Sequence, residues 1–246
     1  MDPIFEAVLG SDEAVAQLLR KSPELSRTRV GQDHLVETIP HWLYVGDTPL
    51  HLAAAALRTG AAKLLLKSGA DANAENRRGA TPLHYACDPR PKSGGTWDPA
   101  KQEDLIELLV QHGAKPDQVD RGGASALHRA VRARSPAAVR QLLKAGARVD
   151  IRLGKSGSTP IHLAVQSTGA SGTAGAVSEQ LEIIVTLLQH GADPAAKDAR
   201  GRSAFDWATN ERVSAALQES PDQSLGRKGS SSKVGRAGRR GRPTSR

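Results

Sequence analysis

Apolar residues in this chain recur in short blocks separated by polar turns, and one six-residue block occurs five times. Each block has a small polar residue, Pro or Ala, an apolar residue, usually His, a variable residue and then Ala. The opening Thr or Ser can cap a helix, and the following Pro fits its first turn, where a missing N–H is harmless. A period near 33 residues predicts a stacked array of similar units. The blocks, whose starts are separated by 33, 44, 34 and 44 residues, are Thr48–Ala53, Thr81–Ala86, Ser125–Ala130, Thr159–Ala164 and Ser203–Ala208.

A second apolar stripe follows each of the first four blocks and ends at a glycine. Glycine readily adopts the left-handed conformation that ends a helix, so each stripe is predicted to be a helix. Another glycine stands two positions before every block, where a tight turn would require positive φ. The predicted unit is therefore helix, turn, helix and projecting hairpin. The predicted second helices cover residues 61–68, 104–112, 136–145 and 181–190.

Three connections are longer than the regular unit requires. Residues 88–101 and 166–180 each hold 11 extra residues, and both are rich in Gly, Pro, Ser and Thr. This composition predicts surface loops. The connection between Pro23 and Thr48 is about 13 residues longer than its counterparts, which predicts an enlarged first hairpin. That hairpin contains His34, His41, Trp42 and Tyr44.

The block Thr-Pro-Leu-His-x-Ala resembles the ankyrin repeat, and four of its five copies are close matches. The resemblance covers about residues 1–220 and implies an all-α solenoid of helix–turn–helix repeats with short β-hairpin loops. A degenerate first unit and a short polar helix at 210–220 are predicted to close the ends of about six repeats. The expected division is an N-terminal cap at 1–44, repeats at about 45–77, 78–121, 122–155 and 156–199, a C-terminal cap at 200–220, and a tail at 221–246.

The positive charge of the chain is concentrated in that tail. The net charge is +8, but residues 221–246 hold eight basic groups and one acid, which leaves 26 basic and 25 acidic residues in the array. A Gly/Ser/Arg-rich tail cannot bury apolar surface and is expected to be disordered. Arg240-Gly241-Arg242-Pro243 resembles the core of an AT-hook, although the preceding Pro is absent. An alternative function is therefore a nucleic-acid-associated scaffold with weak, salt-sensitive contacts from Arg239, Arg240 and Arg242.

The bulk composition limits the class of protein. A hydrophobic content of 38% with 3% aromatic residues suits thin Ala and Leu layers between stacked units. The chain has no run of 18 apolar residues, no signal-peptide pattern and a single cysteine, which fits a reducing compartment without membrane contact. We expect a cytoplasmic monomer, nuclear if the source is a nucleated cell. The Ala-, Arg- and Gly-rich usage favours a GC-rich, bacterial source.

The positions where the copies differ are the predicted binding surface. The hairpin tips, three and four residues before each block, are basic from Arg77 onward. In the array implied by the resemblance, these tips and the variable block residues line a concave face, and Arg, Tyr and Trp are enriched in binding hot spots. The prediction is a non-catalytic scaffold that binds an acidic or mixed protein partner; simple solvation of the charged tips is the competing interpretation. The candidate residues are Trp42, Tyr44, Arg77, Arg78, Tyr85, Arg121, Arg129, Lys155, Arg200 and Trp207.

Eight histidines and one cysteine invite a metal or catalytic interpretation. His34 and His41 share the enlarged hairpin, but no cysteine or paired carboxylate accompanies them. Cys87 lies one helical turn after His84, at a position that other blocks fill mostly with small apolar residues, so packing explains it. We predict neither enzyme activity nor a metal or other cofactor. The resemblance implies that the block histidines bridge the backbones of adjacent repeats; they are His51, His84, His128 and His162.

Overall fold

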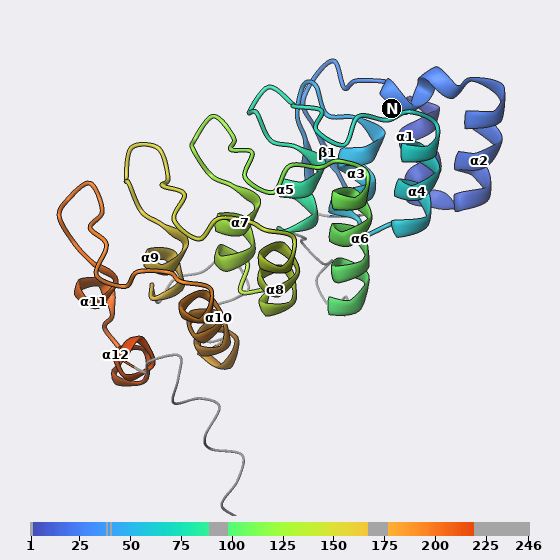
Figure 1. Cartoon of the computed structure of the whole chain (residues 1–246). Helices are drawn as coiled ribbons and strands as arrows, with labels where there is room; N and C mark the ends of the chain where they lie inside the picture. The colour runs from blue at the N-terminus through green and yellow to red at the C-terminus, as the bar shows by residue number, and fades with distance from the viewer. Residues whose placement is uncertain (1, 38, 40, 89–97, 167–176, 219–246) are drawn as a thin grey trace, which may run out of the picture.

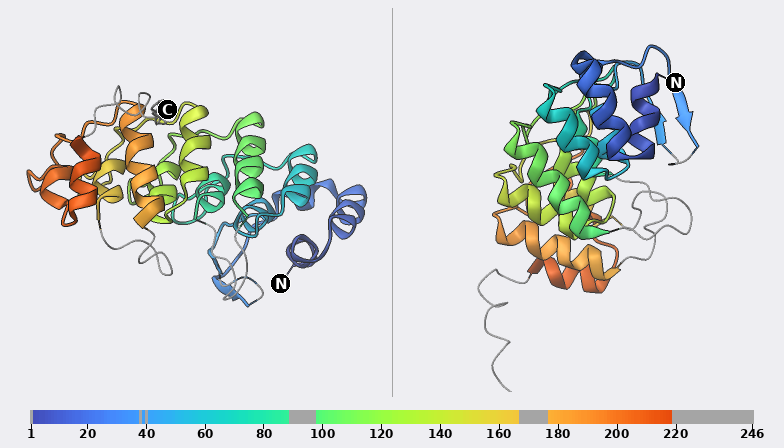
Figure 2. Two further views of the ribbon diagram at one scale, coloured as in Figure 1. Left: turned by 90° about the horizontal axis from the view of Figure 1, so that it is seen from below. Right: turned by 90° about the vertical axis from the view of Figure 1, so that its right-hand side faces the viewer.

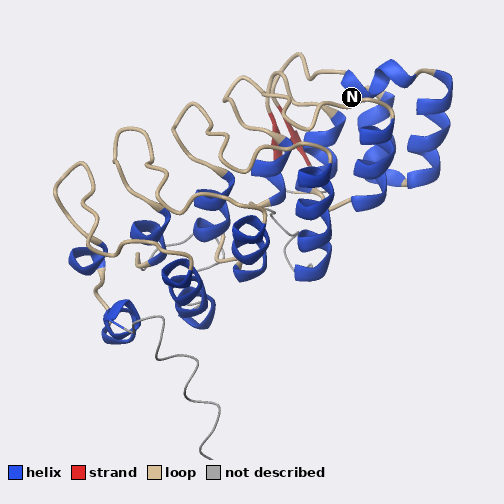
Figure 3. Ribbon diagram, viewed as in Figure 1, coloured by secondary structure: helices blue, strands red, loops and turns tan. Residues whose placement is uncertain are grey.

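The computed structural model describes residues 2–37, 39, 41–88, 98–166 and 177–218. Within these ranges the chain forms a row of helix pairs, with loops that project from it to one side (Figure 1). Coloured by secondary structure, the molecule shows helices throughout the row and one small pair of strands beside it (Figure 3). The prediction of an all-α solenoid with short β-hairpins is confirmed.

Short inner helices line the side of the row from which the loops project. Five of them begin directly after the Thr or Ser of a block, whose side chain caps the helix as predicted. The side chain of the third helical residue accepts the backbone N–H of that Thr or Ser in return, which was not predicted. The inner helix of the degenerate first unit is α1 (Pro3–Gly10). The others are α3 (Pro49–Ala55), α5 (Pro82–Ala86), α7 (Ala126–Arg132), α9 (Pro160–Ala164) and α11 (Ala204–Trp207).

Longer outer helices form the second layer, and each packs against its neighbours along the row. A short 3₁₀ turn, η1 (Pro23–Arg27), follows the first of them. The second apolar stripes predicted from the sequence are therefore confirmed as helices. The outer helices are α2 (Asp12–Lys21), α4 (Thr59–Lys67), α6 (Pro99–Gln111), α8 (Pro136–Lys144), α10 (Val177–Gln189) and α12 (Glu211–Gln218).

Helices α6 and α10 begin earlier than predicted. Residues assigned to the two insertion loops, 99–101 and 177–180, are helical instead. Asp98 causes the earlier start of α6, because its side chain accepts the backbone N–H of Ala100 at 3.1 Å, ahead of Pro99 at the first position. The remainder of the insertions, residues 89–97 and 167–176, lies outside the described residues.

The two extended outer helices are tied to the preceding inner helix in the same way. The Gln102 side-chain amide donates to the carbonyl oxygen of Ala86 at 2.7 Å. Gln180 donates to the carbonyl oxygen of Ala164 at 2.8 Å, again 16 residues back. Each bond satisfies a carbonyl that the end of a short helix leaves without an intrahelical partner.

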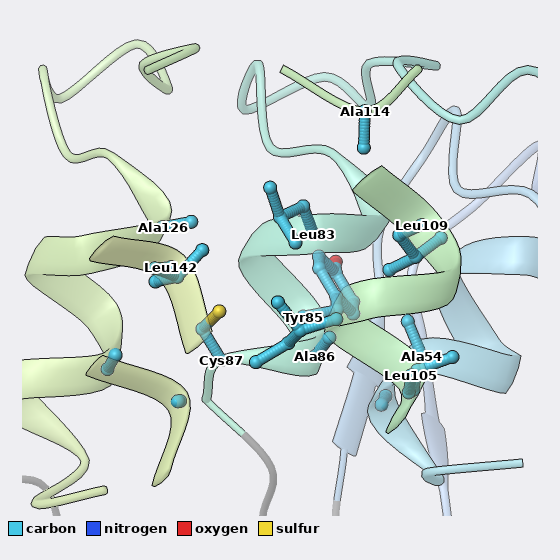
Figure 4. Packing of buried hydrophobic residues seen from close by; sticks show 14 of the residues in the cluster. Ala54, Leu83, Tyr85, Ala86, Cys87, Leu105, Leu109, Ala114, Ala126 and Leu142 are labelled. Atoms are coloured by element: carbon cyan, nitrogen blue, oxygen red, sulfur yellow. The ribbon is translucent and has the colours of Figure 1, made fainter. Parts of the chain in front are cut away.

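The hydrophobic core runs along the whole row as layers between neighbouring units. In Figure 4, Leu83 and Ala86 of α5 lie between the leucines of α6 and the residues of α7. The alanine that ends each of the first four blocks is fully buried, which confirms the predicted close approach of helices. The fifth copy differs, because Ala208 follows the single turn of α11 in extended conformation and is partly buried.

The block histidines join adjacent units through the backbone, as the resemblance implied. His51 Nδ1 accepts the backbone N–H of Thr48 at 3.1 Å, and its Nε2–H donates to the carbonyl oxygen of Ala80 in the next unit at 3.0 Å. This pattern requires the neutral ring. The other three histidines reach the next unit in the same way: His84 to Ala124, His128 to Ser158 and His162 to Arg202.

Burial of three of these rings, those of His51, His84 and His128, opposes their protonation. Burial lowers the pKa of His84 to about 4, with the nearby Arg129 as a further cause. Burial likewise lowers the pKa of His128 to about 4 and depresses that of His51. The folded array therefore holds these histidines neutral at physiological pH.

The enlarged first hairpin forms a two-stranded antiparallel sheet. Strand β1 (His34–Val36) pairs with β2 (His41–Leu43), and Leu35 lies opposite Trp42. Figure 2 shows this hairpin projecting beside the helices at the N-terminal half of the row. Val36 and Leu43 turn inward and are buried, whereas Leu35 and Trp42 face outward. The hairpin thus covers part of the face formed by the inner helices and loop tips, the inner face.

Candidate functional site

Three of the projecting loops end in a tip whose turn is ordered by an Asn or Asp side chain. Asn76 Oδ1 accepts the backbone N–H groups of Arg78 at 2.8 Å and Ala80 at 3.0 Å. Asp120 and Asp198 order the equivalent tips in the same way. These bonds fix where the tip side chains project. The predicted tip glycines all have positive φ, between 62° and 89°: Gly46, Gly79, Gly123, Gly157 and Gly201.

The same Asn or Asp also holds the variable residue of the inner helix, nine positions later. The Asn76 amide donates to the Tyr85 hydroxyl oxygen at 2.9 Å. Arg129 donates to Asp120 at 2.8 Å, and the Trp207 indole N–H donates to Asp198 at 3.1 Å. This pairing was not predicted from the sequence. The pattern that could have indicated it is an Asn or Asp nine positions before the Tyr, Arg or Trp of three blocks.

Tyr85 is buried rather than an exposed anchor, which corrects the expectation for this position. It is 2% exposed, and its hydroxyl donates to Asp47 at 2.8 Å. The His41 ring of β2 lies 4.7 Å from the Tyr85 ring in an edge-on arrangement. The hairpin therefore covers Tyr85 and makes it part of the scaffold. Burial, with Asp47 as the next cause, raises the pKa of the phenol, which stays protonated.

A cavity of about 450 Å³ lies where the hairpin faces α5, α7 and the tips between them. Seven of the ten candidate residues line it, including Trp42 and Tyr44 of the hairpin. Its wall also includes Asp88 and Asp120. The fold thus brings together residues that are far apart in the sequence. The arginines in the wall are Arg77, Arg78, Arg121, Arg129 and Arg132.

Three of these arginines are paired with carboxylates. Arg77 forms an ion pair with Asp33 of the hairpin loop. Arg129 donates to Asp120 at 2.8 Å, and Arg132 donates to Asp88 at 3.0 Å. Burial alone would raise the pKa of Asp120, but the Arg129 hydrogen bond and the tip N–H groups hold it below its usual value. Each of these three arginines thus has its charge compensated by a carboxylate in the folded chain.

The other two arginines, Arg78 and Arg121, lie on neighbouring tips. The Arg78 guanidinium stacks over the Tyr44 ring, with its central carbon 4.2 Å from the ring centroid. The backbone N–H of Arg121 donates to the carbonyl oxygen of Arg78 at 2.9 Å, which couples the two tips. Within the described residues, neither guanidinium has a carboxylate oxygen within 4 Å. These two charges are available to a ligand.

An apolar surface adjoins the cavity on the hairpin. Trp42 is 50% exposed, and its cross-strand partner Leu35 is 47% exposed. Trp42 also lines the cavity, so the apolar and basic surfaces are continuous. Large exposed apolar side chains beside a polar cavity are typical of protein-binding surfaces.

The remaining candidates lie elsewhere. Lys155 and Arg200 are exposed on later tips, and Trp207 is a partly buried residue of the C-terminal unit. The Trp207 indole lies against the guanidinium of Arg202, whose central carbon is 3.8 Å from the ring centroid. None of these three residues lines the cavity. The nucleic-acid candidates Arg239, Arg240 and Arg242 lie outside the described residues.

The described residues contain little chemistry suited to a reaction. Cys87 is fully buried, and burial raises the pKa of its thiol, so the nucleophilic thiolate is disfavoured. No three His, Cys, Asp or Glu side chains in the described ranges are grouped so that they could hold a metal ion. None of the helices seen in those ranges combines the length and apolarity needed to span a bilayer.

Comparison with known proteins gives one family and several relatives. The family model described as ankyrin repeats matches residues 4–92 and 99–198. A neurogenic locus notch homolog protein 1 of Danio rerio is 37% identical over 141 residues, which are 48% of this chain and 6% of the relative. The nuclear factor NF-kappa-B p105 subunit of Gallus gallus is 34% identical over 124 residues, 49% of this chain and 11% of the relative.

A third relative matches a larger part of this chain. The B-cell lymphoma 3 protein homolog of Mus musculus is 31% identical over 163 residues, which are 66% of this chain and 32% of the relative. The chain therefore spans less than a third of the length of each of these relatives. The family match covers most of the helical array, and the capped inner helices, bridging histidines and glycine-tipped hairpins agree with it. The chain belongs to the ankyrin repeat family, a family of protein-interaction domains.

Proposed function

We propose that this protein is a non-catalytic scaffold that binds an acidic segment of a partner protein on its inner face. The binding site is the cavity between the first hairpin and the tips of the next two units. The observation that carries the proposal is the pair Arg78 and Arg121, two guanidinium groups in the cavity wall without carboxylate partners in the described structure. Carboxylates of a partner would form bidentate hydrogen bonds with such groups.

Several features of the cavity support a protein partner. Its wall combines Arg and aromatic side chains, the residue types that dominate the energetics of protein interfaces. Trp42 and Leu35 extend the site with apolar surface, which a partner segment would cover. The tips are already held by side-chain and backbone hydrogen bonds, so their backbone would lose little conformational freedom on binding.

The test is reversal of the two unpaired charges. The double variant Arg78→Glu/Arg121→Glu and the wild-type protein are immobilised, and proteins captured from an extract of the native cell are identified by mass spectrometry. We expect a partner that the wild type retains and the double variant loses. Arg77 is left unchanged because its ion pair with Asp33 joins the hairpin to the tip.

The matched control is Lys63→Glu/Lys67→Glu, which makes the same charge change on exposed positions of outer helix α4. This control should retain the partner, and circular dichroism should show all three proteins folded. Equal capture by the wild type and by folded Arg78→Glu/Arg121→Glu would refute the proposed site.

A further variant separates the alternative based on the tail. Deletion of residues 221–246 should leave capture of the protein partner unchanged, because the proposed site lies entirely within residues 33–132. Loss of the partner on this deletion, with the array still folded, would place the main contact in the tail and contradict the proposal.

A further inference from the structure

The arginines without ion-pair partners in the cavity wall favour some acidic ligands over others. Five arginines are in its wall, and three carboxylates neutralise three of them: Asp33, Asp88 and Asp120. In the described residues, the two remaining guanidinium groups, those of Arg78 and Arg121, have no ion-pair partner. A ligand group with two negative charges would match both guanidinium groups, whereas one carboxylate would match one of them.

The shape of the donors points to the same ligand class. Each guanidinium is a planar fork that donates two parallel hydrogen bonds to one anion. A phosphoryl group presents three acceptor oxygens and about −1.5 to −2 charge at neutral pH, so it can bridge two forks at once. A carboxylate has two oxygens in one plane and is matched to a single fork.

The backbones of both arginines and the guanidinium of Arg78 are held in place without a ligand. The Arg78 backbone N–H is bound by Asn76 at 2.8 Å, and its guanidinium lies on the Tyr44 ring. The Arg121 backbone N–H donates to the carbonyl oxygen of Arg78 at 2.9 Å, which fixes the spacing of the two tip backbones. A site arranged in advance loses less freedom on binding and discriminates better by ligand geometry.

We propose that the cavity binds a phosphorylated side chain of a partner protein, with the phosphoryl group bridging Arg78 and Arg121. The source is a protein segment because the exposed pair Leu35 and Trp42 continues the cavity wall. A large apolar residue next to the phosphorylated one would cover this pair, which a free phosphate ester would leave exposed. This inference rests on the proposed function and specifies the partner's chemistry.

The experiment compares peptide libraries that differ at one fixed residue. The full chain is titrated with degenerate peptides whose central residue is a phosphorylated Ser, Thr or Tyr, the same residue without phosphate, or Glu, and binding is read by fluorescence anisotropy. We expect the phosphorylated library to bind at least tenfold more tightly than the Glu library, with large apolar residues enriched next to the phosphate.

Two variants make the readout specific. Arg78→Lys/Arg121→Lys keeps the charge but removes both forks, so it should lose most of the phosphate preference while still binding the Glu library. Lys63→Gln/Lys67→Gln on α4 should leave the preference unchanged. In addition, the arginine Nε–H signals of Arg78 and Arg121 in ¹H–¹⁵N spectra should shift with phenyl phosphate at lower concentrations than with benzoate.

The outcomes distinguish this inference from the proposed function. Equal affinity for the phosphorylated and Glu libraries would overturn the phosphate preference and leave the acidic-segment site standing. Phosphorylated peptides that bind no more tightly than phenyl phosphate would overturn the choice of a protein segment. No binding of any anionic library, together with undiminished partner capture by Arg78→Glu/Arg121→Glu, would overturn both.

Discussion

Tyr85 of α5, in the middle of the array, and Trp207 of α11, in the C-terminal unit, occupy the same block position. Both side chains hydrogen-bond the Asn or Asp nine residues earlier in their own tip. Tyr85 nevertheless has 2% of its surface exposed, because the first hairpin covers it and Asp47 accepts its hydroxyl. Trp207 has no such cover in the described structure, and the flat face of its ring is contacted by Arg202.

The difference shows that the direction in which the variable side chain points and the extent of its burial are determined by different parts of the chain. The repeat determines where the variable side chain points and which tip residue holds it. The connection between Pro23 and Thr48 then determines whether that side chain is core or surface. The hairpin that buries Tyr85 also forms part of the cavity wall, so one long connection creates both a local core and one side of the cavity.

Truncation of the two aromatic residues should have the largest and most unequal effect. Tyr85→Ala removes a fully packed ring and the hydrogen bonds between its hydroxyl and the side chains of Asp47 and Asn76, and should lower the free energy of unfolding by about 3–5 kcal/mol. Trp207→Ala should cost about 1 kcal/mol, because the ring is partly solvated. Urea unfolding followed by circular dichroism measures both. Equal losses would mean that the hairpin does not protect Tyr85 in solution.

A second comparison uses two glycines at the same tip position. An alanine Cβ at Gly123 would lie 2.3 Å from the backbone nitrogen of Gly154, whereas Gly201 has no heavy atom within 4 Å of that position. Both have positive φ, so each alanine variant costs about 1–2 kcal/mol of backbone strain. Gly123→Ala should cost about 1–3 kcal/mol more, because neighbouring backbone must move. Thermal unfolding of the two variants should show this order, and a reversed order would contradict the packing between tips.

The sequence predicted those parts of the fold that depend on local rules. Helix caps at Thr48 and its equivalents and the positive-φ glycines follow from side-chain chemistry within a few residues. The bridging histidines contact the next unit, and it was the resemblance to the ankyrin repeat that indicated them. The burial of Tyr85 could not be predicted this way, because its cover comes from His41, about 40 residues earlier in the chain. The early start of α6 was predictable in principle, since Asp98-Pro99 is a cap followed by a first-turn proline.

The sequence indicated the residue types that line the cavity but not which of its charges are paired. The sequence indicated basic tips and nearby aromatic residues, and seven of the ten candidates line one cavity. Which arginines remain free depends on partners from other segments, such as Asp33 for Arg77 and Asp88 for Arg132. These partners have no fixed spacing in the sequence, so only the folded chain distinguishes Arg78 and Arg121 from the rest.

Mild acid should weaken the array through its buried histidines. The pKa values of His84 and His128 fall from an unfolded value of 6.5 to about 4 on folding. Below pH 6.5 the unfolded chain therefore takes up more protons, and stability is lost as the pH falls from about 6.5 toward 4. Between pH 7 and 5.5 each ring should cost about 1 kcal/mol. Urea midpoints that stay constant over this range would contradict neutral histidines in the folded state.

The smallest effects on stability are expected for two arginines that each stack on an aromatic ring, Arg202 and Arg78. Only one of them should affect partner binding. Arg202 contacts both the Trp207 ring and the buried carboxylate of Asp198, so Arg202→Ala should lower the unfolding free energy by about 1 kcal/mol and leave partner binding unchanged. Arg78 stacks on Tyr44 without an ion pair in the described residues, so Arg78→Ala should cost less than about 0.5 kcal/mol but reduce partner capture several-fold. Paired urea titrations and capture assays measure both quantities. If Arg78→Ala destabilised the array as much as Arg202→Ala and left capture intact, Arg78 would be a structural residue. The contrast between the units beside the first hairpin, which are proposed to bind the partner, and the C-terminal unit, which only stabilises the array, would then fail.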